Sequence, residues 1–383
     1  MNILLLNYGE ADNNSACHIL GHARALAARG HDVCVCVAKS VADDVFEPQE
    51  GFLMASQKTV LKHGPHFADG RKADVLHAWT PRETIRQFVA KFSAAWGFRA
   101  LVIHLEDNEA AIFERFTGRS VAEASKEDQE WPKGLIHPLR HHAFLESAQG
   151  VTLVHRCLEP LVSPNLPRKE LVPVMDFAFF SDGDRSALLR SQMGISPAAN
   201  VIAFNGNDHA AAAMDIRQLY DAVELLVERG RDVVFLRTGH VLPANYEGLQ
   251  LRPGPRCIEL GFIERARVPE VMRLADVVIQ PGDADAFNSF RLPAKVPEYL
   301  AMGKPLVMGA ANLGHELSAA GAGCVLPRMS PGAMAEAAGQ LLDDPARAAA
   351  LGARGHQFAR RRFAEDAVTP ELESFYQECL RHK

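Results

Sequence analysis

The feature that most constrains the fold is a repeated alternation of short apolar runs with helical stretches. An apolar run at 2–6 precedes a polar loop, "NYGEADNNS", and then a helical stretch from Ala16 to Arg29 that ends at Gly30. A second apolar run follows at 32–38, and Asn14 or Ser15 can cap the helix between the runs. Further runs lie at 74–78, 100–105 and 151–155. Strands that alternate with helices pair in parallel and are covered on both faces, so this half predicts a parallel sheet.

A second series of the same kind begins at residue 200. Apolar runs lie at 200–206, 232–239, 257–262, 276–282, 305–309 and 324–327, and helices are expected at 331–343, 345–362 and 366–382. The sequence predicts an α/β protein with two Rossmann-like domains, 1–175 and 200–362, joined by a Pro- and Ser-rich linker at 176–199. Residues 363–383 are expected to form a helix that packs back on the N-terminal domain. Because such sheets bind ligands at the carboxyl ends of their strands, we expect a ligand in a cleft between the two domains.

Composition excludes several classes of protein. The chain has 383 residues, of which 48% are hydrophobic and 23% charged, with a formal net charge of −6. That charge gives no general attraction to nucleic acid, and no apolar run approaches the length of a bilayer span. "MNILLL" has no basic flank before it, and the seven cysteines are scattered without CxxC spacing. We expect a cytoplasmic protein with reduced thiols, with peripheral contact to the inner face of the membrane left open.

The stretch "RLPAKVPEYLAMGKPLV" at 291–307 predicts a loop, a short helix and a strand. Proline is tolerated only in the first turn of a helix, so Pro297 allows a helix that begins near Lys295. Glu298 then lies in the first turn, and Gly303 suits the left-handed position after the last turn.

The charges of this stretch suit a nucleotide. Arg291 and Lys295 add two cations to the partial positive charge of a helix N-terminus, which favours a phosphate. Glu298 can accept hydrogen bonds from a diol such as a ribose. The alternative is that Glu298 only complements the helix dipole and pairs with Lys295 on the surface.

Several motifs, taken in order, resemble one known family. They are "LAARGHDV", "DVLHAW", "VIHLEDNE", "LVPVMDFAFF", "LGFIERARVPEVMRLADVVIQPG" and "LPAKVPEYLAMGKPLV". Together they are similar to glycosyltransferases of the GT-B fold, in particular retaining family 4, over nearly the whole chain. The resemblance implies transfer of a sugar from a nucleoside diphosphate sugar to an acceptor hydroxyl, with retention.

The resemblance also implies roles for residues of the second domain. Glu298 would contact the donor ribose, and Arg291 and Lys295 would neutralise the diphosphate. Two departures stand out, because Phe290 occupies the usual position of a first glutamate and "NGNDHAAAA" replaces an expected Arg and Lys. The other donor-side candidates, each with a turn, cap or structural alternative, are Gly206, Asn207, His209, Arg237, Gly239, Gly314 and His315.

In the first domain the resemblance places His104 beneath the transferred sugar. The alternative is a core histidine whose hydrogen bonds go to the protein itself. Asp107 is a candidate on the acceptor side, and Gly9, Asn13 and Asn14 are candidates near the acceptor or the leaving phosphate, with helix capping as their alternative.

We expect no metal and no cofactor apart from the donor substrate. The adjacent His141 and His142 have no spaced carboxylate or cysteine partners, and the leaving-group charge can be met by cations. Two other functions stay open. One is a non-catalytic protein that binds a nucleotide sugar or a partner, and the other is a nucleotide-sugar epimerase. The acceptor is equally open among a glycan, a lipid-linked sugar, a protein and a small molecule.

Overall fold

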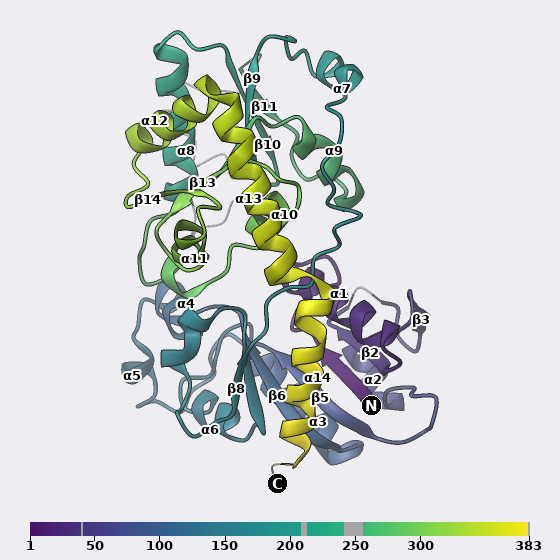
Figure 1. The fold of residues 1–383 in the computed structure, drawn as a ribbon. Coiled ribbons are helices and arrows are strands. Elements are labelled where there is room, and N and C mark those ends of the chain that lie inside the picture. The colour runs from purple at the N-terminus through teal and green to yellow at the C-terminus, as the bar shows by residue number, and fades with distance from the viewer. Residues whose placement is uncertain (40, 208–212, 241–255, 382–383) are drawn as a thin grey trace. The chain divides into compact units, whose positions relative to one another are not determined.

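The computed structural model describes residues 1–39, 41–207, 213–240 and 256–381. They divide into two units, each with its own parallel sheet (Figure 1). The first unit comprises Met1–Val174, Phe290–Leu292 and Phe363–Lys383, and the second comprises Met175–Ser289 and Pro293–Arg362. The predicted α/β class is therefore confirmed.

The sheet of the first unit has the strand order β3-β4-β2-β1-β5-β6-β7-β8. All neighbours pair in parallel except β3 and β4. Its strands are β1 (Asn2–Leu6), β2 (Asp32–Val37), β3 (Phe46–Pro48), β4 (Leu53–Ser56), β5 (Ala73–Trp79), β6 (Phe98–Leu105), β7 (Gly150–Leu153) and β8 (Arg168–Glu170). Its helices are α1 (Asn14–Ala28), α2 (Gln57–His63), α3 (Glu83–Ala95), α4 (Glu109–Thr117), α5 (Val121–Ala124), α6 (His141–Glu146) and α14 (Glu365–Arg381).

The sheet of the second unit has the order β11-β10-β9-β12-β13-β14, and every pair is parallel. Its strands are β9 (Asn200–Asn205), β10 (Val233–Thr238), β11 (Cys257–Glu259), β12 (Val277–Gln280), β13 (Leu306–Gly309) and β14 (Cys324–Leu326). Its helices are α7 (Ala187–Gln192), α8 (Ala213–Glu228), α9 (Val268–Arg273), α10 (Lys295–Ala301), α11 (Leu313–Ala319), α12 (Pro331–Asp343) and α13 (Pro345–Phe363).

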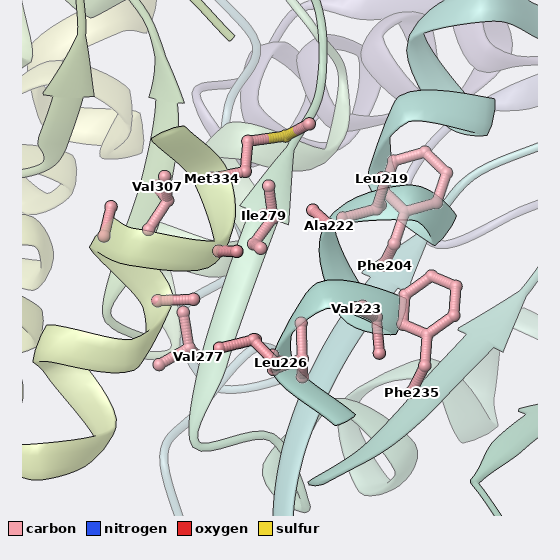
Figure 2. Close-up of a cluster of buried hydrophobic side chains, with 14 of the residues drawn as sticks. Phe204, Leu219, Ala222, Val223, Leu226, Phe235, Val277, Ile279, Val307 and Met334 are labelled. Carbon is pink, nitrogen blue, oxygen red and sulfur yellow. The ribbon is translucent and has the colours of Figure 1, made fainter. Parts of the chain in front are cut away.

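One apolar layer holds α8 and α12 against the second sheet. Figure 2 shows Leu219, Val223 and Leu226 of α8 facing strand side chains such as Phe235 and Ile279. Alternate strand residues point to this face because side chains in a strand have a period of two. The intervening residues are also buried, as at Val234 and Val278, so the sheet is covered on both faces as parallel sheets require.

The C-terminal helix α14 belongs to the first unit. It contacts β5, β6 and α1 (Figure 1). Its buried residues include Leu372, Phe375 and Tyr376, which repeat at helical spacing. A Cβ atom on Gly150 would lie 2.5 Å from Cys379 Sγ and 2.6 Å from the Phe375 ring, so this glycine lets α14 approach β7 closely.

The predicted cap of the first helix is wrong. The structure places the N-cap at Asn13, whose Oδ1 accepts a hydrogen bond from the backbone N–H of Ala16 at 2.7 Å. Asn14 and Ser15 are the first two helical residues instead. Asn13 also accepts from Asn7 Nδ2 at 3.2 Å, so a contact to the end of β1 adds to the cap. Among the described residues, no helix is long and apolar enough to cross a bilayer.

Candidate active site

The carboxyl ends of β9 and β10 meet the start of α10 at Asn205. The backbone N–H of Asn205 donates to Tyr299 Oη at 2.7 Å, and its Oδ1 accepts from Thr238 Oγ1 at 2.6 Å. Its Nδ2 lies 3.4 Å from Glu298 Oε2. Asn205 therefore joins two strands and a helix at the sheet edge where parallel sheets bind ligands.

Glu298 lies in the first turn of α10, as predicted, and is only 4% exposed. Arg265 Nη1 donates to Glu298 Oε1 at 3.1 Å, and Lys295 Nζ lies 3.8 Å from the same oxygen. Both cations thus approach one carboxylate oxygen, while Oε2 has, among the described residues, only the long contact to Asn205. An acceptor-only group in this arrangement can receive hydrogen bonds from hydroxyl groups, while the cations beside it suit a phosphate.

Arg265 is a residue that the sequence reasoning did not single out. Its side chain is about half exposed, and its guanidinium lies 5.2 Å from the centre of the Phe180 ring. It lies in the "FIERAR" segment, which belongs to one of the motifs of the family resemblance. That motif is the sequence feature that could have pointed to Arg265. Its spacing from Glu298 gives no hint of contact, because the two are 33 residues apart.

Gly206 and Gly239 bring the ends of β9 and β10 into backbone contact. Gly239 has φ +101°, and a Cβ atom on it would lie 2.3 Å from the carbonyl oxygen of Gly206. Their N–H groups bond within the protein, to Thr238 O at 3.2 Å and Gly261 O at 2.7 Å. Asn207 Oδ1 accepts from the backbone N–H of His240 at 2.9 Å. These contacts fix the described residues that directly follow β9 and β10. The candidate His209 lies outside the described residues.

Arg237 is fully buried. Its Nη1 donates to Tyr220 Oη at 3.0 Å and its Nη2 to the backbone oxygen of His240 at 3.3 Å. The Tyr220 hydroxyl in turn contacts Glu259. The guanidinium therefore supports the loop after β10 from inside the protein.

Gly314 lies where α11 passes the end of β13. A Cβ atom on Gly314 would lie 2.2 Å from the carbonyl oxygen of Gly309, and its own N–H donates to Ala311 O at 2.8 Å. The neighbouring His315 is exposed. A larger residue at position 314 would therefore clash with the backbone, so packing explains the glycine. Packing gives no such reason for the exposed histidine at 315.

The three candidate residues of the 291–307 stretch do not fall in one unit. Lys295 and Glu298 lie together in the second unit, whereas Arg291 is grouped with the first. There burial raises the pKa of Asp107 to about 7, and the Arg291 charge opposes this shift with a smaller effect. A strongly raised pKa of this kind marks Asp107 as a candidate functional residue.

The other first-unit candidates lie around the end of β1. Gly9 gives room to Asn13, because a Cβ atom on Gly9 would lie 2.0 Å from Asn13 Nδ2. The Asn13 side chain is the helix cap, and Asn14 is exposed in the first turn of α1. The capping alternative given above therefore holds for Asn13, whereas Asn14 does not cap the helix and lies on the surface.

The structure adds a polar cluster that the sequence reasoning missed. Ser15 Oγ donates to Glu106 Oε2, and His18 Nδ1 lies 3.3 Å from Glu106 Oε1. Nearby, Arg82 pairs with Glu109 at 3.0 Å, and its guanidinium lies 4.2 Å from the Tyr8 ring centre. The acidic run "EDNE" directly after β6 could have indicated this cluster from the sequence. Polar residues at the carboxyl end of a parallel strand lie at the sheet edge where ligands bind.

His104 is 1% exposed at the end of β6. Its Nδ1 lies 2.8 Å from Thr152 Oγ1, and its ring centre lies 4.6 Å from that of Trp79. Burial lowers the pKa of His104 well below the ordinary value, with a smaller contribution from His77, so the imidazole is neutral.

Residues 199–344 match the family described as glycosyl transferases group 1. This segment contains Asn205, Arg265, Lys295 and Glu298. The second unit therefore carries a glycosyl transferases group 1 domain.

Solved structures show that the fold of this chain is GT-B. Sucrose-phosphate synthase (tll1590) from Thermosynechococcus elongatus is 15% identical, with a TM-score of 0.71 over 99% of this chain and 98% of that one. Anabaena Alr3699/HepE in complex with UDP and glucose is 17% identical, with a TM-score of 0.71 over 98% and 99%. The catalytic domain of Starch synthase IV from Arabidopsis thaliana bound to ADP and acarbose is 11% identical, with a TM-score of 0.66 over 99% of each chain. No curated protein is a significant match. The resemblance to GT-B glycosyltransferases is confirmed.

Proposed function

We propose that this protein moves a sugar from a nucleoside diphosphate sugar to an acceptor hydroxyl, with anomeric retention and without a resident metal. The observation that carries the proposal is Glu298, a buried carboxylate at the carboxyl edge of the second sheet with Arg265 and Lys295 on one of its oxygens. A ribose diol would donate to the carboxylate, and the diphosphate would lie near the cations.

Charge stabilisation is the main catalytic contribution of these residues. The bond between the sugar and the diphosphate breaks with negative charge developing on the diphosphate, so preplaced cations lower the barrier. Lys295 and Arg265 are the candidates of the second unit, and we assign Arg291 the same role. A front-face reaction, in which the leaving phosphate takes the acceptor proton, retains the anomeric configuration and needs no protein base.

Ligands in the similar structures support the choice of donor. Alr3699/HepE was solved with UDP-glucose and with UDP, and Starch synthase IV with ADP. All three ligands share a nucleoside diphosphate, which is the part that Glu298 and its cations suit. The first unit then supplies the acceptor side, with Asp107 and the cluster around Glu106 as its polar groups.

A thermal-shift experiment tests donor binding. Wild type is screened against UDP, GDP, ADP and TDP, and we expect one of them to raise the melting temperature. Saturating ligand at about 100 times its Kd stabilises by about 2.7 kcal/mol. Glu298→Ala should lose most of this shift, because hydrogen bonds to a charged group contribute about 1.5–3 kcal/mol. The matched control is Glu270→Ala, which removes a half-exposed carboxylate of the same unit.

Product analysis then separates the three candidate functions. Sugar appearing on an added acceptor supports transfer. Conversion of the donor alone into an epimer would identify an epimerase, and binding without any product would identify a non-catalytic protein. If no diphosphate shifts the wild type, the donor assignment is wrong.

A further inference from the structure

A chain of hydrogen bonds runs from the C-terminal helix to His104 through the interior of the first unit. Tyr376 Oη of α14 lies 2.7 Å from Nδ1 of His77 on β5. His77 Nε2 lies 2.8 Å from Thr152 Oγ1 on β7, and the same hydroxyl lies 2.8 Å from His104 Nδ1. The first three residues are 0% exposed and His104 is 1% exposed, so bulk water does not compete with these bonds.

The number of available protons allows only one direction of donation along these hydrogen bonds, from Tyr376 towards His104. Among the described residues, His77 Nδ1 is the one hydrogen-bond partner of the Tyr376 hydroxyl, so that hydroxyl must donate to it. His77 then carries its proton on Nε2 and donates to Thr152. The Thr152 hydroxyl, whose oxygen already accepts from His77, donates to His104 Nδ1.

The reverse direction leaves a buried proton without an acceptor. If His104 carried its proton on Nδ1 and donated to Thr152, then either Thr152 or Tyr376 would hold a hydroxyl proton with nowhere to go. Such a buried donor costs free energy that the forward direction avoids. Burial also lowers the pKa of His77 and of His104 well below the ordinary value and raises that of Tyr376, so both rings are neutral and the phenol keeps its proton.

We propose that Tyr376 is a positioning residue which, through His77 and Thr152, holds His104 as the neutral tautomer with its proton on Nε2. In this state Nε2 donates a hydrogen bond and cannot accept one. The catalytic consequence rests on the proposed function, since a donor at Nε2 would hold an oxygen of the transferred sugar. The tautomer itself does not depend on that function.

Nitrogen NMR on full-length protein labelled with ¹⁵N-histidine reads the tautomer directly. We expect His77 and His104 each to show a protonated Nε2 and an unprotonated Nδ1, with signals assigned from His77→Gln and His104→Gln spectra. In Tyr376→Phe the donor at the head of the chain is lost, so His104 should shift toward a mixture of both tautomers. A wild-type His104 protonated on Nδ1 would overturn the proposal, as would a His104 tautomer unchanged in Tyr376→Phe.

Matched variants separate the hydrogen bonds from packing. Phe375→Leu alters the adjacent buried side chain of α14 and should lower stability while leaving the His104 tautomer unchanged. Thr152→Ser keeps the relaying hydroxyl and should keep the tautomer, whereas Thr152→Val should lose it. If Phe375→Leu shifts the tautomer as far as Tyr376→Phe does, packing is the cause and the proposal fails.

Kinetics test the consequence for transfer. Tyr376→Phe should lower kcat about tenfold with KM for the donor within about twofold, because the lost alignment acts on the reacting sugar and not on the nucleotide. An unchanged kcat despite a shifted tautomer would show that the tautomer has no catalytic role. A wild type that shows the expected tautomers but transfers no sugar would instead refute the proposed function and leave the hydrogen-bond chain intact.

Discussion

At the scale of single residues, buried polar side chains fix the backbone around the candidate donor site. Asn205 and Arg237 both make several bonds inside the second unit, and each bond fixes a segment near the candidate donor site. The sequence identified Arg237 as a candidate that faces the ligand. The structure places its guanidinium inside the protein, where it supports the loop after β10.

This placement predicts that Arg237→Met mainly affects stability. Loss of the guanidinium should cost about 1.5–3 kcal/mol, because the buried Tyr220 hydroxyl and the backbone oxygen of His240 would lose a charged hydrogen-bond donor. Urea unfolding followed by circular dichroism measures this change. Arg231→Met, which removes a partly exposed ion pair with Asp343, should have little effect. A stable Arg237→Met protein that no longer binds a diphosphate would instead support direct ligand contact.

At the scale of elements, the sequence predicted the two parallel sheets and the short helix of the 291–307 stretch. The observed α10 begins at Lys295, and Gly303 after it has φ +63°, as predicted. The short strands β3, β4 and β8 were missed. They have three or four residues each, and β3 (FEP) and β8 (RKE) contain charged residues, so no apolar run stands out there.

The close backbone contact between Gly239 and Gly206, at the ends of β10 and β9, predicts the effect of a substitution on stability. Gly239→Ala should lower the free energy of unfolding by about 1–3 kcal/mol, because an L-residue is strained at φ +101° and its Cβ would overlap the backbone of Gly206. It should also weaken diphosphate binding by displacing the loop. Gly332→Ala is the control, because its new Cβ meets no atom within 4 Å in helix α12. Thermal unfolding with and without the diphosphate measures both effects, and equal stability of the two variants would contradict the packing argument.

At the scale of the whole molecule, stability should depend on the protonation of a buried lysine. Lys304 is 6% exposed, and its Nζ donates to Arg273 O at 3.0 Å. Burial lowers its pKa from 10.5 to about 8. Between these two pH values the unfolded chain binds a proton that the folded chain does not, so stability rises with pH and is lost as pH falls toward 8.

The measurement compares wild type with Lys304→Met from pH 8 to pH 10.5. The difference between their unfolding free energies should change by about 3 kcal/mol in favour of wild type as the pH rises. Comparison with the variant cancels the titration of other groups, such as tyrosines. Parallel pH profiles for the two proteins would show that Lys304 has an ordinary pKa in the fold.

The sequence by itself determined the α/β class, the positions of the main strands along the chain, the position of α10 and the similarity to glycosyltransferases. These properties follow from local periodicity, turn residues and motif order, which a linear chain displays directly. Only the tertiary structure decided that Arg265 reaches Glu298, that Arg237 faces inward, and that Tyr376 is linked to His104 across almost the length of the chain. Such contacts join residues from 17 to 299 positions apart, and no local pattern encodes them because packing alone brings the partners together.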